Sequence, residues 1–83
     1  MENTEDLIKL GKDEIYAMSF EEALEKLEHV VGLLEKGSVS LDEAIELYVL
    51  GTKLRKHCDY TLKKAQERVD EISLEDPGTT ESN

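Results

Sequence analysis

Residues 34–43 read LEKGSVSLDE, and this stretch contains the end of one predicted helix and the start of the next. Gly37 stands where a residue with left-handed backbone conformation commonly ends a helix. Ser40 and Glu43 have the S-x-x-E spacing of a capping box, in which the two side chains satisfy free backbone N–H groups at a helix start. The connection at residues 37–40 is therefore very short, which favours antiparallel packing of the helices that it joins.

The segment before this turn has the pattern of an amphipathic helix from about residue 20 to residue 36. Ser19 and Glu22 have the spacing of another capping box, so the helix is predicted to begin at Phe20. Its apolar residues recur every three or four positions and gather in an arc about 120° wide. They are Phe20, Ala23, Leu24, Leu27, Val30, Val31 and Leu34. This arc predicts one buried face and a charged face toward water.

The segment after the turn is predicted to be a longer helix, from about residue 41 to residue 72, because no proline interrupts it. Its length of ~48 Å is about twice the ~25 Å of the first helix. Apolar residues in its first half spread over roughly 200°, which is wider than one neighbouring helix needs, so we expect two neighbours there. Its second half carries a coiled-coil spacing of four and three at Cys58, Leu62, Ala65, Val69 and Ile72. We expect that part to pack on another chain or on a folded-back N-terminal segment.

The sequence thus predicts an all-α fold, an antiparallel two-helix hairpin over residues 19–72 with a longer second helix. The packing is predicted to resemble a spectrin repeat or a coiled coil and to be completed by oligomerisation. Residues 1–18 are predicted to be either flexible or a short helix, and Gly11 would interrupt any helix there. Residues 73–83 have no period and are mostly polar, so a disordered acidic tail is predicted.

Charge and composition exclude several functions. The chain has 83 residues, with 20 Asp and Glu against 10 Lys and Arg and a formal net charge of -10. Because this charge repels phosphates, we expect little or no direct DNA binding by the chain alone. The only basic concentration is Lys53, Arg55, Lys56, Lys63, Lys64 and Arg68, which we expect to be scattered around the second helix. No apolar run approaches the ~20 residues that cross a bilayer. The single cysteine and the acidic N-terminus favour a cytoplasmic protein.

No convergent set of catalytic, cofactor-binding or metal-binding residues is apparent, and we expect none. The acidic residues Glu21, Glu25, Glu28, Glu35, Asp42 and Glu46 fall mainly on polar helix faces. A carboxylate-dependent metalloenzyme is therefore the weakest alternative. His57 and Cys58 are adjacent, so their side chains point about 100° apart on a helix, which is poor geometry for binding one ion. Cys58 is predicted to be a packing residue.

Three segments follow one another along the sequence, SFEEALEKLE at residues 19–28, LEKG at 34–37 and SLDEA at 40–44. They resemble a known family, the exodeoxyribonuclease VII small subunit. The second helix is also similar, with Leu47, Tyr48, Gly51, Leu54, Cys58, Leu62, Ala65, Gln66, Glu67 and Val69 spaced as in that family. The resemblance covers about residues 19 to 72. It implies a cytoplasmic bacterial complex that degrades single-stranded DNA from both ends into oligonucleotides, with the catalytic residues in the large subunit.

We accordingly expect two partners, the exodeoxyribonuclease VII large subunit and further copies of the small subunit. The predicted partner interface consists of Leu47, Tyr48, Gly51, Leu54, Cys58, Leu62, Ala65, Val69 and Ile72. Gly51 lies in the middle of the second helix, which suggests a tight helix crossing. Periodicity alone also fits an alternative, a self-associating helical scaffold or adaptor without a nuclease partner. Co-purification of a nuclease subunit would distinguish the two.

Overall fold

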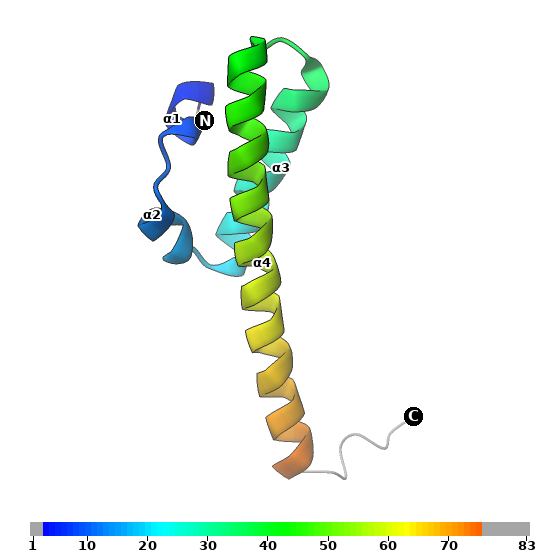
Figure 1. Ribbon diagram of the computed structural model, residues 1–83. Helices are drawn as coiled ribbons and strands as arrows, with labels where there is room; N and C mark the ends of the chain where they lie inside the picture. The colour runs from blue at the N-terminus through cyan, green and yellow to red at the C-terminus, as the bar shows by residue number, and fades with distance from the viewer. Residues whose placement is uncertain (1–2, 76–83) are drawn as a thin grey trace.

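The computed structural model describes residues 3–75, which form helices and connections without a strand. The helices are α1 (Thr4–Ile8), α2 (Lys12–Tyr16), α3 (Phe20–Lys36) and α4 (Leu41–Glu75). The predicted all-α class is therefore confirmed. α3 lies beside α4 and runs in the opposite direction, whereas α1 and α2 lie along another side of α4 (Figure 1). One end of α4 projects well beyond the other three helices.

Local hydrogen bonds account for both ends of α3. The Ser19 hydroxyl oxygen accepts the backbone N–H of Glu22 at 3.1 Å, and the Glu22 carboxylate accepts the N–H of Ser19 at 2.9 Å. At the other end, Gly37 has a φ of 67° and a left-handed conformation that residues with a Cβ rarely adopt. The capping box and the glycine ending that the sequence predicted are both confirmed.

A capping box also begins α4, whereas the end of this helix differs from the prediction. The Ser40 hydroxyl oxygen accepts the N–H of Glu43 at 3.2 Å, and the Glu43 carboxylate accepts the N–H of Ser40 at 3.2 Å. The helix then continues to Glu75, past the predicted end at Ile72, so the tail predicted from residue 73 is wrong for its first residues. No helix-breaking residue precedes Pro77, which is why α4 can continue. The rest of that predicted tail, residues 76–83, lies outside the described residues.

The hydrophobic core surrounds the first half of α4. Its buried members are Leu7, Ile15, Ala23, Val30, Leu47, Leu50, Leu54 and Cys58. α4 contacts α3 and also contacts α1 and α2. The wide apolar arc predicted two neighbours for this half of the helix, and the structure places three helices against it, all from the same chain.

The N-terminal segment is helical and packs against α4. Asn3 caps α1, because its side-chain oxygen accepts the N–H of Asp6 at 2.9 Å. The Glu14 carboxylate accepts the N–H of Gly11 at 2.9 Å at the start of α2, so the glycine separates two short helices. The segment lines grooves with α4 residues that lie between Ile45 and Tyr60. It therefore covers the first half of α4 and leaves the projecting end uncovered.

The molecule is elongated, with extents of 55 × 27 × 20 Å. We call residues 3–60 the head, because they contain α1, α2, α3 and the part of α4 on which these helices pack. We call α4 residues 61–75 the overhang. The overhang is the lower part of α4 in Figure 1, where it stands apart from the other helices.

Candidate protein-binding surfaces

The structure divides the predicted interface residues into two groups. Leu47, Leu54 and Cys58 are buried in the head, where they belong to the core of the single chain. Their side chains are inaccessible to a second molecule while the head is intact. The remaining large apolar members are exposed, namely Tyr48, Leu62, Val69 and Ile72, and Ala65 is exposed as well. The periodicity that grouped these residues does not reveal how far along α4 the shorter helix α3 reaches.

Gly51 is half-buried and faces α3. A Cβ atom added there would lie 3.5 Å from Cγ1 of Val30 and 3.8 Å from Cδ1 of Leu27. Both separations are ordinary van der Waals contacts, so an alanine fits between the helices. The tight helix crossing expected from the sequence is therefore wrong. A glycine at a core position of a helix does not by itself set the distance to the neighbouring helix. That distance also depends on the size of the side chains opposite, which here are Val30 and Leu27.

The exposed apolar residues of the overhang form one continuous surface, the overhang seam, defined by Leu62, Ala65, Val69 and Ile72. The exposed fractions are 57% for Leu62, 54% for Val69 and 55% for Ile72. At 100° per residue, the seam lies on the same side of α4 as the buried residues Leu54 and Cys58. The face that packs on α3 within the head thus continues past the end of α3, and no other described residue covers it.

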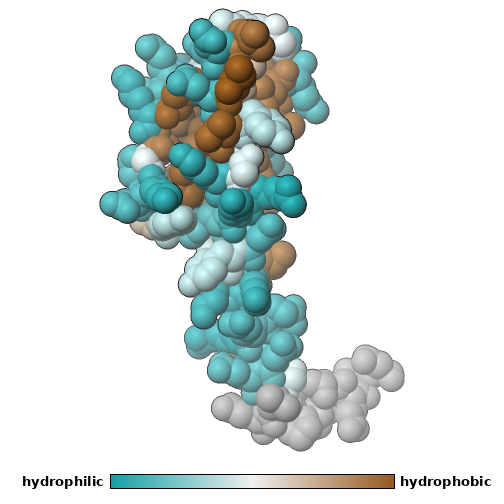
Figure 2. Space-filling view, viewed as in Figure 1, coloured by the Kyte–Doolittle hydropathy of each residue, from teal (hydrophilic) through white to brown (hydrophobic). Residues whose placement is uncertain are grey.

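A second apolar surface lies on the head, and we call it the head patch. It consists of Leu41, Ile45, Tyr48 and Val49 of α4, of which Leu41 and Tyr48 are 76% and 71% exposed. Beside it, Ile8 and Leu10 contribute to a shallow groove between α4 and the N-terminal segment. Figure 2 shows apolar residues gathered over the upper part of the molecule, whereas the projecting end of α4 is mostly hydrophilic in this view.

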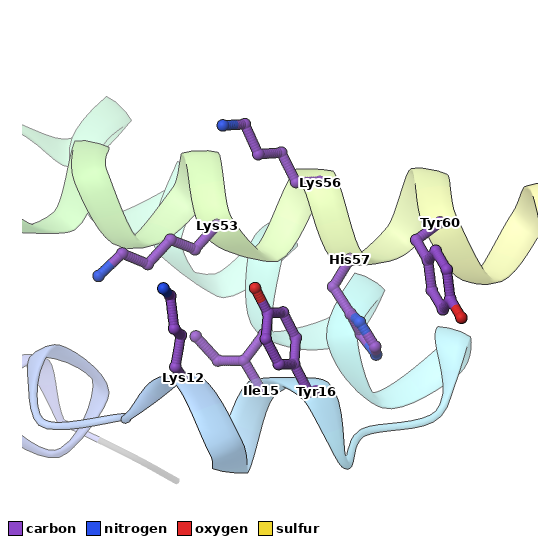
Figure 3. Close-up of a pocket in the computed structure, with 7 residues that line it drawn as sticks. All are labelled: Lys12, Ile15, Tyr16, Lys53, Lys56, His57 and Tyr60. Atoms are coloured by element: carbon purple, nitrogen blue, oxygen red, sulfur yellow. The ribbon is translucent and has the colours of Figure 1, made fainter.

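A cleft of different character lies between α2 and α4. It has a volume of ≈ 770 Å³ and is lined by Lys12, Ile15, Tyr16, Lys53, Lys56, His57 and Tyr60 (Figure 3). We call it the basic cleft. The buried His57 ring lies between the two tyrosines, with ring centroids 5.9 Å from Tyr16 and 6.3 Å from Tyr60. Its Nε2 donates to the carbonyl oxygen of Met18 at 2.8 Å, which places the proton on that nitrogen.

Sequence reasoning missed the basic cleft. Lys12 is far from Lys53 in the sequence, and only the folding of α2 onto α4 brings them to one site. The positions of Lys53, Lys56 and Tyr60 along the second helix provided a partial signal, because a helix places them on one side.

Cys58 is a free, buried thiol at the border between the head and the overhang. Burial and, to a smaller extent, the negative charge of Asp59 raise the pKa of this thiol above its ordinary value of 9.0. The protonated form therefore prevails near neutral pH, as suits a side chain in a core. Within residues 3–75, no three His, Cys, Asp or Glu side chains are grouped so that they could hold a metal ion. Nor does any helix in that range combine the length and apolarity needed to span a membrane.

Comparison with known proteins identifies the family. Residues 20–76 match the model of a family described as Exonuclease VII small subunit. A relative from Sinorhizobium medicae, named Exodeoxyribonuclease 7 small subunit, is 45% identical over 68 residues, which are 82% of this chain and 82% of the relative. A relative of the same name from Bartonella bacilliformis is 44% identical over 73 residues, covering 88% and 87% of the two chains. Another, from Ruegeria pomeroyi, is 51% identical over 61 residues, covering 74% and 85%.

No solved structure gives a significant match. The family matches confirm the resemblance seen in residues 19 to 72, and they do not favour a scaffold without a nuclease partner. The described structure is compatible with this assignment, since it consists of helices and carries exposed apolar surface. The chain belongs to the exonuclease VII small subunit family.

Proposed function

We propose that this small subunit binds the large subunit of exonuclease VII through the overhang seam and carries no catalytic residue of its own. The large subunit would then degrade single-stranded DNA from both ends into oligonucleotides, with the small subunit supporting its active form. The observation that carries the proposal is that the helix face buried in the head continues, uncovered, over the overhang. We place the complex in the cytoplasm because bacterial DNA lies there.

The lengths of the two long helices explain why the overhang needs a partner. α4 has 35 residues and α3 has 17, which correspond to about 52 Å and 25 Å. About 22 Å of α4 therefore projects beyond the head. Leu62, Ala65, Val69 and Ile72 continue the spacing of four and three from Cys58, which is the pattern that packs knobs into holes of a neighbouring helix. A helix of the large subunit can occupy the position that a longer α3 would have taken.

The energy available from the seam is modest. Leu62, Val69 and Ile72 are each slightly more than half exposed, so burying them completely contributes about 1 kcal/mol or more per side chain. A total of about 3–5 kcal/mol is too small for a stable complex, because association also costs translational and rotational freedom. A second surface must contribute, and the head patch offers one. This supports an assembly in which each small subunit has more than one contact.

We further propose that small subunits associate with each other through the head patch, with coiled-coil or spectrin-like packing. The centre of this patch lies about 22 residues from the centre of the overhang seam along α4, or about 33 Å. One chain can therefore contact the large subunit with the overhang and another copy with the head. In this arrangement the helical fold is completed by oligomerisation.

Three parallel assays of single-stranded DNA degradation test the proposal. They use the purified chain alone, its cognate large subunit alone, and the two together. Activity that appears or rises markedly only in the mixture supports the proposed role. If the chain has neither a physical nor a functional effect on the large subunit, a self-associating scaffold becomes the better interpretation.

Matched glutamine variants then locate the contact. Leu62→Gln with Val69→Gln makes the seam polar, and we expect it to weaken binding to the large subunit at least about tenfold. Glu67→Gln with Glu71→Gln changes exposed residues on the opposite side of the same helix, and binding should stay as in the native chain. Circular dichroism checks that both variants keep their helices. Equal losses in the two variants would remove the overhang seam from the interface.

A further inference from the structure

We propose that the basic cleft binds single-stranded nucleic acid, with its lysines holding backbone phosphates and Tyr16 and Tyr60 stacking on bases. This is a second binding function, distinct from the contact with the large subunit. It departs from the expectation, based on net charge, that the chain makes little or no direct contact with DNA.

The first observation is the local charge. Acidic residues outnumber basic ones 20 to 10 in the chain, yet none of the residues that line the cleft is acidic and three are lysines. In Figure 3, Lys12 of α2 and Lys53 of α4 extend to the same side of the cleft, whereas the Lys56 side chain extends away from α2. Among the side chains that the structure describes, none forms an ion pair with these lysines. Two unpaired ammonium groups that face one site repel each other, and an anion between them removes that repulsion.

The second observation is that the positive charge continues along α4 as far as Lys64, beyond which Glu67 and Glu71 lie on the same side of the helix. At 100° per residue, Lys53, Lys56, Lys63 and Lys64 lie within an arc of about 100°, with Tyr60 in the middle of it. The six basic residues are therefore less scattered than expected, because Arg68 lies only about 40° outside this arc and Arg55 alone lies on another side of the helix. Lys64 pairs with Glu67 at 3.6 Å, but both side chains are exposed, and such pairs are weak. A stripe of this length suits a linear polyanion better than a small anion.

The third observation concerns the aromatic rings. Tyr16 and Tyr60 are 62% and 59% exposed, and they lie on either side of the buried His57 ring. The contact of His57 with the Met18 carbonyl ties the segment after α2 to α4, so the two tyrosines are held at one site. Exposed aromatic rings beside cationic side chains are typical of sites for single strands, whose base faces are free to stack. An acidic peptide would use the lysines and would leave the tyrosine faces unused.

The fourth observation is that this site does not compete with the proposed contact between the overhang seam and the large subunit. The lysine stripe and the overhang seam lie about 170° apart around α4. A small subunit can therefore hold a nucleic acid strand on one side and a protein helix on the other. The net charge of -10 repels a nucleic acid strand at long range and so weakens its binding to the isolated chain. Affinity is higher inside a complex that already holds the strand, because the local concentration of the strand is then higher.

The test uses the full chain and an oligodeoxythymidylate of about ten nucleotides, titrated by nuclear magnetic resonance in about 50 mM salt. We expect amide shifts confined to α2 and to α4 residues 53–64. The logarithm of the association constant should fall with the logarithm of salt concentration with a slope of about -2, as for three neutralised phosphates on a single strand. Oligouridylate forms a second arm, and binding of either polymer at the cleft supports the proposal. Absence of binding by both polymers overturns the proposal.

Lysine variants decide whether the cleft is the site. Lys12→Ala with Lys53→Ala should weaken binding at least about fivefold. The matched control is Lys9→Ala with Lys36→Ala, which removes the same charge from exposed positions outside the cleft and should change affinity less than about twofold. Equal weakening in both variants would show long-range electrostatics alone and would overturn the proposal.

Tyrosine variants decide whether the ligand is a nucleic acid. Tyr16→Leu with Tyr60→Leu keeps apolar bulk and removes the stacking faces, and we expect at least about a fivefold loss of affinity for the oligonucleotide. A polyglutamate peptide of similar length should bind more weakly than the oligonucleotide and should not respond to these variants. If the peptide binds as tightly, the cleft is a site for an acidic protein segment and the proposal fails.

Binding assays with the large subunit distinguish a failure of this proposal from a failure of the proposed function. Lys12→Ala with Lys53→Ala should bind the large subunit as tightly as the native chain does. Leu62→Gln with Val69→Gln should bind the oligonucleotide as tightly as the native chain does. A failure of nucleic acid binding therefore leaves the subunit contact intact, and a failure of the subunit contact leaves the cleft to be judged by its own titration.

Discussion

Within α4, the part in the head and the overhang have similar apolar spacing, yet their side chains have opposite environments. Leu47 and Leu54 are fully buried in the head, whereas Leu62 and Val69 are more than half exposed in the overhang. The difference arises because α3 has 17 residues and α4 has 35. A coiled-coil spacing thus produces a core where the chain folds back on itself and a free surface where it does not.

This comparison separates the source of stability from the source of binding. The head has a core of residues from all four helices. The overhang is supported only by local contacts, such as the hydrogen bond between Gln66 and Asp70 at 3.1 Å and the exposed ion pair between Lys64 and Glu67. Isolated helices of this length are marginal in water, so the overhang depends on propagation from the head. Binding of a partner to the overhang therefore breaks few contacts within the chain.

The largest expected effect tests this comparison directly. Leu54→Ala removes a fully buried side chain from the head and should lower the free energy of unfolding by about 2–5 kcal/mol. Leu62→Ala makes the same change in the overhang and should cost less than about 1 kcal/mol. Urea unfolding of the two variants measures both values. Similar losses would show that the overhang is buried in solution, for example by a second copy of the chain.

Gly51 gives the next effect, with a sign that depends on the size of the new side chain. Gly51→Ala should stabilise the head by up to about 1 kcal/mol, because alanine favours a helix and its Cβ makes ordinary contacts with Val30. Gly51→Leu should destabilise it by about 1–3 kcal/mol, because the longer side chain pushes α3 away from α4. Thermal unfolding distinguishes the two, with Glu25→Ala on the exposed face of α3 as the neutral control. Destabilisation by alanine would mean that the helices lie closer together than described.

A smaller effect concerns the cap that begins α4. Ser40→Ala removes a hydroxyl oxygen that accepts a backbone N–H and should cost about 1 kcal/mol. Ser38→Ala in the same turn is the control, because Ser38 is exposed and the capping hydrogen bonds are made by Ser40 and Glu43. Chemical denaturation measures the difference. If both variants are neutral, α4 gains its stability from its core contacts and the cap contributes nothing.

The smallest effect is the pH dependence at Cys58, the last buried residue before the overhang. Its pKa is raised in the folded state, so its contribution to stability is complete below the ordinary value of 9.0 and is lost as the pH rises through the folded value. The native chain should therefore lose stability relative to Cys58→Ala in alkaline solution. Unfolding of both proteins across this range isolates the thiol from other titrating groups. A constant difference would show that Cys58 is hydrated and that the head ends earlier along α4.

Local sequence was sufficient for both ends of α3, for the start of α4 and for the family. The pairs Ser19 with Glu22 and Ser40 with Glu43 cap helices through hydrogen bonds that span three residues, so their spacing alone predicts them. The same holds for the left-handed Gly37. The resemblance of residues 19 to 72 rests on residues in order along the chain, and comparison with relatives confirmed it.

Only the tertiary structure decided which residues of the apolar seam are covered. It also showed that the N-terminal helices pack on α4 and that Lys12 joins Lys53 in the basic cleft. These features depend on contacts between residues far apart in the sequence. A helical period states which residues share a face, but it carries no information about what lies opposite that face. For this reason the seam was visible in the sequence, and the division between core and open surface was not.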